Sequence, residues 1–96
     1  MIHNMNYEWD EGKRAANLAK HGIDFNDAAD FDWSTAIETV DDRYDYGETR
    51  WVALGNLKQR LHVIIYTLRD DSIRIISLRK ANPRERQYYE TQTQQH

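Results

Sequence analysis

Cationic side chains gather between residues 69 and 86, where they could bind a phosphate. The apolar run from Ile73 to Leu78 is typical of a buried strand, and Arg79 and Lys80 follow it directly. Arg binds phosphate through two parallel hydrogen bonds, whereas Lys supplies a compact charge. We predict a phosphate-binding site formed by the cations of this stretch, which are Arg69, Arg74, Arg79, Lys80 and Arg86. The alternative is a solvated strand end with ordinary surface arginines.

A helix is predicted to begin directly after these cations. Asn82 can cap this helix, Pro83 suits its first position, and Glu85 stands where a capping box needs a carboxylate. The free N–H groups of a helix start carry partial positive charge, which adds to the attraction for a phosphate. Glu85 could also act as a base, although its place in the capping box gives it a structural role.

Proton transfer is expected from His21, because an unperturbed imidazole titrates close to neutral pH. Lys20 is a neighbouring cation. The position also allows a structural interpretation, since a protonated His is favoured at the last turn of a helix. His62 lies in a predicted strand and carries less weight, and His3 and His96 lie near the ends of the chain.

Two tyrosines on the predicted C-terminal helix are candidates for stacking on a nucleotide base. We predict such a contact from Tyr89, and Tyr88 is its neighbour. The alternative is that both rings pack on the inner face of the helix.

No metal or cofactor is expected. The chain has no Cys, which removes disulfides, thiolate metal sites and cysteine nucleophiles. Its adjacent acidic pairs are Asp41–Asp42 and Asp70–Asp71, and neighbouring side chains in a strand or loop tend to point apart. No apolar run is long enough to cross a bilayer, so we expect a cytoplasmic protein.

The net charge of −3 hides an uneven distribution. Residues 1–56 carry 5 Lys or Arg against 12 Asp or Glu, whereas residues 57–96 carry 8 against 4. A basic C-terminal half can meet a phosphate backbone, and an acidic N-terminal half can meet a basic partner. The alternative is that the two halves neutralise each other across the fold.

The N-terminal part is predicted to form a short strand and two helices. Residues 6–9 alternate in polarity, and a helix from Glu11 to His21 should end at Gly22. We expect the buried stripe of this helix to consist of Ala15, Leu18 and Ala19. A second helix should follow Asp24, with an inner face formed by Phe25, Ala28 and Ala29.

The remaining residues predict an antiparallel sheet and a C-terminal helix. Strands are expected at residues 36–40, 50–54, 61–68 and 73–78, and short turns link the last three as hairpins. Helices precede and follow the strands, so we predict that residues 1–96 form one α+β domain with four to five strands. Residues 91–96 have no apolar side chain and are expected to form a disordered tail.

The sequence resembles the BrnT family of bacterial toxins from about Tyr7 to Tyr89. The likeness is carried, in order, by Trp9-Asp10-Glu11-Gly12-Lys13, Asn17, Lys20-His21-Gly22-Ile23-Asp24-Phe25, Ala28-Ala29, Gly55, Tyr66-Thr67 and the stretch from Arg74 to Arg86. The resemblance implies a RelE-like α+β fold, ribonuclease activity that halts growth, and neutralisation by a BrnA-like antitoxin. Such an antitoxin carries a ribbon-helix-helix domain, through which the complex would bind DNA.

Cleavage of RNA without a metal needs a base for the 2′-hydroxyl, cations on the phosphate and an acid for the leaving oxygen. We therefore expect a metal-independent endoribonuclease, whose catalytic candidates are His21, Arg79, Lys80 and Glu85. Further RNA contacts are expected from Lys20, Arg69, Arg74, Arg86 and Tyr89. The alternative is a non-catalytic module that acts as a co-repressor with a DNA-binding partner.

Overall fold

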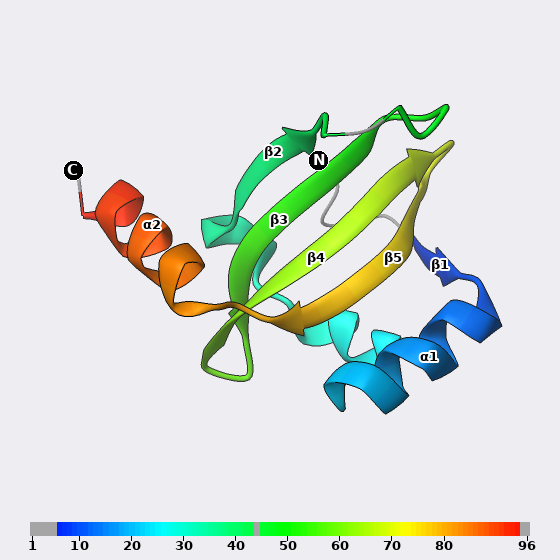
Figure 1. The fold of residues 1–96 in the computed structure, drawn as a ribbon, viewed down its shortest axis with the longest axis horizontal. Coiled ribbons are helices and arrows are strands. Elements are labelled where there is room, and N and C mark those ends of the chain that lie inside the picture. Colours follow the sequence, from blue (N-terminus) through cyan, green and yellow to red (C-terminus); the bar gives the residue numbers. More distant parts are fainter. Residues whose placement is uncertain (1–5, 44, 95–96) are drawn as a thin grey trace.

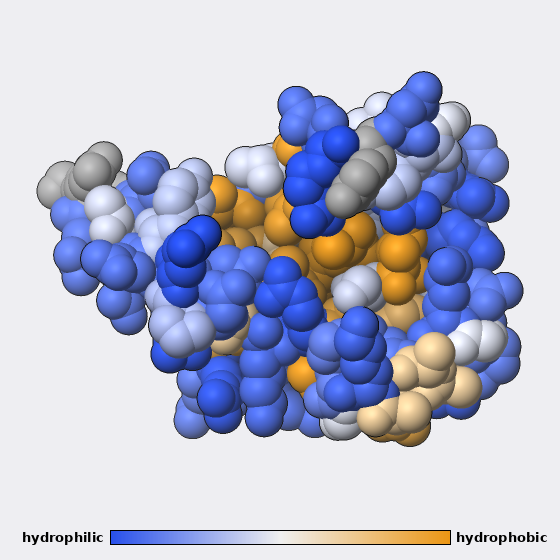
Figure 2. All heavy atoms as spheres, in the orientation of Figure 1, coloured by the Kyte–Doolittle hydropathy of each residue, from blue (hydrophilic) through white to orange (hydrophobic). Residues whose placement is uncertain are grey.

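The computed structural model describes residues 6–43 and 45–94, which form a five-stranded sheet with helices (Figure 1). In chain order the elements are β1 (Asn6–Trp9), α1 (Glu11–His21), the 3₁₀ helices η2 (Phe25–Asp30) and η3 (Trp33–Thr35), β2 (Ile37–Asp41), β3 (Arg50–Leu57), β4 (Arg60–Arg69), β5 (Ser72–Lys80) and α2 (Pro83–Thr93). The predicted α+β class is confirmed. One face of the molecule has an apolar hollow at its centre (Figure 2).

The sheet is mixed, so the prediction of an antiparallel sheet is wrong for one strand. The strand order is β1-β5-β4-β3-β2, and β2 to β5 pair antiparallel with their neighbours in sequence. β1 instead runs parallel to β5, from Asn6 opposite Ser72 to Trp9 opposite Ile75. Strands joined by a tight hairpin must be antiparallel. β1 and β5 are far apart in sequence, so the connection between them also allows a parallel pair.

β5 carries one extra residue relative to β4. Ile65 pairs with Ser77 while the next residue, Tyr66, pairs with Ile75, so Ile76 has no partner on β4. A bulge of this kind bends its strand and increases the local twist. The bulge follows directly on the last residue of β5 that β1 covers, and it marks the place where the edge of β5 becomes open.

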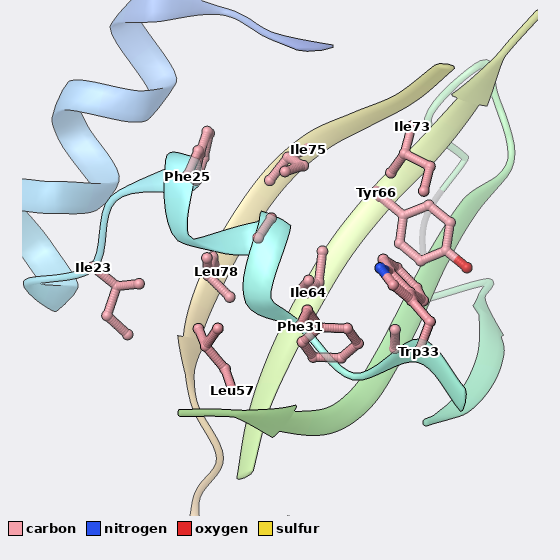
Figure 3. Packing of buried hydrophobic residues seen from close by; sticks show 12 residues of the cluster. Ile23, Phe25, Phe31, Trp33, Leu57, Ile64, Tyr66, Ile73, Ile75 and Leu78 are labelled. Atoms are coloured by element: carbon pink, nitrogen blue, oxygen red, sulfur yellow. The ribbon is translucent and has the colours of Figure 1, made fainter. Parts of the chain in front are cut away.

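The second predicted helix is a 3₁₀ helix, and its buried side chains recur every three residues. Phe25, Ala28 and Phe31 are at most 5% exposed, whereas Ala29 is exposed, so its predicted place on the inner face is wrong. Figure 3 shows Phe25 and Phe31 between η2 and the sheet, where they join Ile64 in the main apolar core.

α1 buries an amide where an apolar stripe was predicted. Asn17 is 7% exposed and is the buried residue of this helix. The residues of the predicted stripe are exposed instead, and they are Ala15, Leu18 and Ala19. The ends of the helix are as predicted, because the Asp10 side chain caps its start and Gly22 ends it with a φ of 72°.

Asn17 forms hydrogen bonds with backbone groups at the open edge of β5. Its Nδ2 donates to the carbonyl oxygen of Leu78 at 2.7 Å, and its Oδ1 accepts from the backbone N–H of Leu78 at 3.1 Å. Nδ2 also donates to the carbonyl oxygen of Ile23 at 3.0 Å. The amide thus bonds β5 as a neighbouring strand would, and it ties the loop after α1 to the sheet.

α2 begins at the predicted capping box but buries none of its residues. The Asn82 side chain accepts from the N–H of Glu85, and the Glu85 side chain accepts from the N–H of Asn82. The helix continues to Thr93, so the predicted tail is helical over residues 91–93, while residues 95–96 lie outside the described part. Figure 1 shows α2 projecting away from the sheet.

Replacing Asn17 by Leu should lower the free energy of unfolding by about 2–4 kcal/mol, because the backbone groups that the amide bonds would lose a buried partner. Chemical denaturation followed by circular dichroism measures this loss. Leu18→Ala is the control on the same helix; its side chain is 41% exposed and should contribute less than about 1 kcal/mol. A larger loss for Leu18→Ala than for Asn17→Leu would contradict this account of α1.

Candidate functional site

The sheet face opposite α1 and η2 is apolar at its centre, and we call it the open face. Its floor is formed by alternate residues of β3 and β4, namely Val52, Leu54, Leu61, Val63 and Ile65. Figure 2 shows an apolar hollow here, surrounded by polar side chains. Between the floor and α2 lies a space of about 170 Å³, which Glu85 and Tyr88 help to line.

Arg79 leaves β5 at the rim of the open face, opposite Val63, and Glu85 holds it. Its Nη1 and Nη2 each donate to one carboxylate oxygen of Glu85 at 2.8 Å, and Nη1 also donates to the carbonyl oxygen of Lys80 at 3.3 Å. These bonds use the end of the guanidinium group. The edge formed by Nε and the second hydrogen of Nη2 has no partner among the described residues, so it is available for a bidentate phosphate contact.

Glu85 orients Arg79 and is a poor base. Both of its carboxylate oxygens accept from Arg79, and Oε1 also accepts from the backbone N–H of Asn82 at 2.9 Å. The hydrogen bonds from Arg79 lower the pKa of the Glu85 carboxyl, so the group stays ionised near neutral pH and binds a proton weakly. The geometry therefore favours a positioning role for Glu85 over the predicted catalytic one.

Lys20 and His21 are the last two residues of α1. Burial lowers the pKa of His21 below its ordinary value of 6.5, and the charges of Lys20 and Arg79 lower it further. The imidazole is therefore mostly neutral at pH 7 and able to accept a proton. Of the predicted site residues, Arg79 and Glu85 are in direct contact, and the charges of Lys20 and Arg79 reach His21.

Lys80 lies on the opposite face of the sheet from Arg79, because consecutive residues of a strand alternate. It pairs across the sheet with His62, whose pKa is lowered by burial and, to a smaller extent, by the charge of Lys80. His62 is 5% exposed, and its Nδ1 bonds the carbonyl oxygen of Arg60 at 2.7 Å. His62 is thus a core residue, and Lys80 does not converge with Arg79.

The other predicted cations are dispersed over the molecule. Arg69 lies 3.6 Å from Glu48 at the far end of β4, and Arg74 bonds Glu8 on β1 at 3.1 Å. Arg86 on α2 donates to a backbone carbonyl oxygen at 3.2 Å. Two of these cations from the basic half thus pair with carboxylates of the acidic half, which agrees with the alternative that the halves neutralise each other.

Tyr89 packs against the sheet, and Tyr88 is the exposed tyrosine of α2. The Tyr89 hydroxyl donates to the carbonyl oxygen of Thr35 at 3.0 Å, and its ring contacts the apolar cluster of the open face. Tyr88 is 48% exposed and lines the space between the floor and α2. This arrangement makes Tyr88, rather than the predicted Tyr89, available for stacking.

The acidic side chains of residues 6–43 and 45–94 do not converge. In this part of the chain no three His, Asp or Glu side chains meet as a metal site would need. Asp41, from one of the acidic pairs, accepts from Arg43 at 2.8 and 3.0 Å. His3 and His96 lie outside the described residues.

Neither α1 nor α2 combines the length and the apolarity that a helix crossing a bilayer requires, and the same holds for the rest of the described chain.

The chain was compared with known protein families and solved structures. A family described as "Ribonuclease toxin, BrnT, of type II toxin-antitoxin system" matches residues 9–85. The chain belongs to the BrnT family. It is also similar to the crystal structure of the BrnT ribonuclease toxin of Brucella abortus, with 30% identity and a TM-score of 0.61, over 82% of this chain and 99% of the other. No curated protein matches the chain.

This BrnT-family protein is therefore a ribonuclease toxin of a type II toxin–antitoxin system, and the resemblance found in its sequence is confirmed. Family membership supports ribonuclease activity in general, with RNA as the substrate and an antitoxin as the partner.

Two residues beside the site were missed by the sequence analysis. Lys13 stands one turn before Asn17 on α1, and Ser77 lies next to the bulge of β5. Both line a hollow of about 220 Å³ together with Lys20 and His21. On α1, Lys13, Asn17, Lys20 and His21 are spaced so that they share one helix face. This spacing in the sequence could have indicated Lys13.

Acidification should remove the stabilisation that Glu85 contributes. Because the pKa of Glu85 in the folded protein lies below its ordinary value of 4.5, this contribution is present above that pH and is lost as the pH falls through the lowered pKa. The difference in unfolding free energy between the wild type and Glu85→Gln should therefore shrink below about pH 4.5. Urea denaturation at a series of pH values measures it, and a difference independent of pH would contradict the lowered pKa.

Proposed function

We propose that this BrnT-family protein cuts RNA internally by attack of a ribose 2′-hydroxyl on the adjacent phosphate, without a metal ion, in the cytoplasm. The observation that carries the proposal is Arg79, whose guanidinium is fixed by Glu85 while its Nε–Nη2 edge stays available and its charge reaches His21. A cation that is fixed before the substrate arrives stabilises developing negative charge without reorganisation.

His21 is the proposed base. Its neutral imidazole accepts the proton of the 2′-hydroxyl as that oxygen attacks phosphorus and the bond to the 5′-oxygen breaks. Arg79 binds the non-bridging oxygens, where negative charge grows. The leaving 5′-oxygen takes a proton from solvent, and the upstream fragment ends in a 2′,3′-cyclic phosphate. Lys20, exposed beside His21, adds positive charge for the RNA strand.

The purified protein should cut RNA in EDTA, and Arg79→Ala should lower kcat about 10²–10³-fold, the loss expected on removal of one charge-stabilising donor. Gel analysis of labelled RNA measures the rate, and cyclic-phosphate ends identify the chemistry. Arg84→Ala is the matched control, because Arg84 is an exposed arginine on α2 whose side chain has no hydrogen bond or ion pair among the described residues. Arg79→Lys keeps a charge beside Glu85 but lacks the guanidinium, and it should also lose most of the activity.

Three outcomes would count against these assignments. Activity that disappears in EDTA and returns with Mg²⁺ would overturn the metal-independent mechanism. Equal cutting by Arg79→Ala and Arg84→Ala, in variants that keep the circular dichroism spectrum of the wild type, would overturn the role of Arg79. Harmless expression and intact RNA, together with tight partner binding, would favour the non-catalytic co-repressor.

We propose that a BrnA-like antitoxin covers the open face. Val52 and Ile65 in the floor of the open face are partly exposed, and exposed apolar surface marks sites of protein interaction. The family is one of type II toxin–antitoxin systems. An antitoxin segment along Val52 and Ile65 would also block access to Arg79 at the rim. Through its ribbon-helix-helix domain the antitoxin would carry the complex to DNA.

Val52→Asp combined with Ile65→Asp should weaken antitoxin binding at least about 100-fold, because each change buries an unpaired charge under the partner. Leu18→Asp on α1 is the matched control, since it alters an exposed apolar residue away from the open face and should leave binding unchanged. Titration calorimetry with the small protein encoded beside the toxin gene measures the affinity. Unchanged binding by the double variant would place the antitoxin elsewhere.

A further inference from the structure

A hollow of about 220 Å³ lies at the edge of the sheet, between α1 and the bulge of β5. α1 contributes Lys13, Lys20 and His21 to its walls, and the bulged strand contributes Ile76 and Ser77. The cleavage chemistry proposed above uses His21 but assigns no role to Lys13, Ser77 or the hollow itself.

The charged and titratable side chains in these walls are all basic. Lys13 and Lys20 are exposed, and neither side chain has an ion-pair or hydrogen-bond partner among the described residues. They stand two helical turns apart on one face of α1, about 10 Å along its axis. Most arginines of the strands are by contrast paired with carboxylates, as are Arg50, Arg69, Arg74 and Arg79.

The bulge opens the wall that faces the lysines. β1 ends opposite Ile75, and beyond it α1 borders this edge of β5 through the bonds from Asn17 to Leu78. Ser77 lines the hollow, and its hydroxyl has no hydrogen-bond partner within the described part of the chain. A hydroxyl donor beside two ammonium groups suits the oxygens of a phosphate.

We propose that this hollow binds backbone phosphates of RNA next to the scissile phosphate, through Lys13, Lys20 and Ser77. The inference rests on the proposed cleavage at Arg79 and His21. Ser77 connects the two places, since it lines the hollow and stands two residues before Arg79 on the same face of β5. The RNA strand would thus run from the rim of the open face to the edge of the sheet beside α1, and the lysines would hold it without touching the reacting atoms.

Lys13→Gln combined with Lys20→Gln should raise the Kd for a 2′-O-methyl RNA strand about tenfold at about 0.1 M salt. Each phosphate neutralised on a single strand contributes about 0.7 to the slope of log Kd against log salt concentration, so the slope should fall by about 0.7–1.4. Fluorescence anisotropy measures both quantities, and the methylated strand cannot be cut. With cleavable RNA, KM should rise about tenfold while kcat changes less than about threefold.

Lys58→Gln combined with Arg84→Gln is the matched control, because it removes the same charge from the β3–β4 turn and from α2. It should leave Kd and the salt slope near the wild-type values. Ser77→Ala should weaken binding by less than the lysine pair and leave the slope unchanged, since it removes no charge.

An equal loss of RNA affinity in the two double variants would overturn the proposal, because the change in net charge alone would then explain both losses. Wild-type Kd and slope in the Lys13 and Lys20 variant would overturn it as well, even if the wild type cuts RNA. A wild type that binds methylated RNA through these lysines but never cuts RNA would support the binding site and overturn the cleavage proposal.

Discussion

The open edge of β5 beyond Ile75 is the constraint on which the rest of the structure depends. β1 stops there, and backbone groups at a buried strand edge are costly unless they are bonded. Asn17 bonds both the N–H and the carbonyl of Leu78 and thereby fixes α1 against the strand. Arg79 is the next residue of β5, and His21 follows Asn17 by one helical turn, so one amide sets the relative position of both groups proposed to act on RNA.

Signals within a few residues predicted the ends of the elements. The Asp10 cap, the left-handed Gly22 and the Asn82–Glu85 capping box all depend on local bonds, and all are present. The errors concern partners that are distant in sequence. α1 was expected to bury Ala and Leu, as a helix on an apolar surface does, but it lies beside a strand edge that needs an amide. The parallel pairing of β1 likewise depends on which edge of the sheet is vacant, which no local pattern reveals.

The sequence indicated which residues were candidates for the site, but it did not indicate how they are arranged. Arg79 and Lys80 were grouped because they are adjacent in sequence, whereas strand alternation directs their side chains to opposite faces. The Arg79–Glu85 pair depends on the bend between β5 and α2, which capping alone does not determine. Lys13 and Ser77 line the same hollow, but the hollow could not be predicted. The position of Ser77 depends on the β4–β5 register and its bulge, and that register is a property of the assembled sheet.

The weak attachment of α2 makes the stability of the molecule uneven. The helix buries none of its residues, and its bonds to the rest of the fold include the Arg79–Glu85 ion pair and the bond from Tyr89 to Thr35. Isolated helices of this length are marginal in water. Amide hydrogens of α2 should therefore exchange through local opening, while those of the central strand β4 exchange only when the core unfolds. The C-terminal helix can thus rearrange on contact with another molecule while the sheet beneath it stays folded.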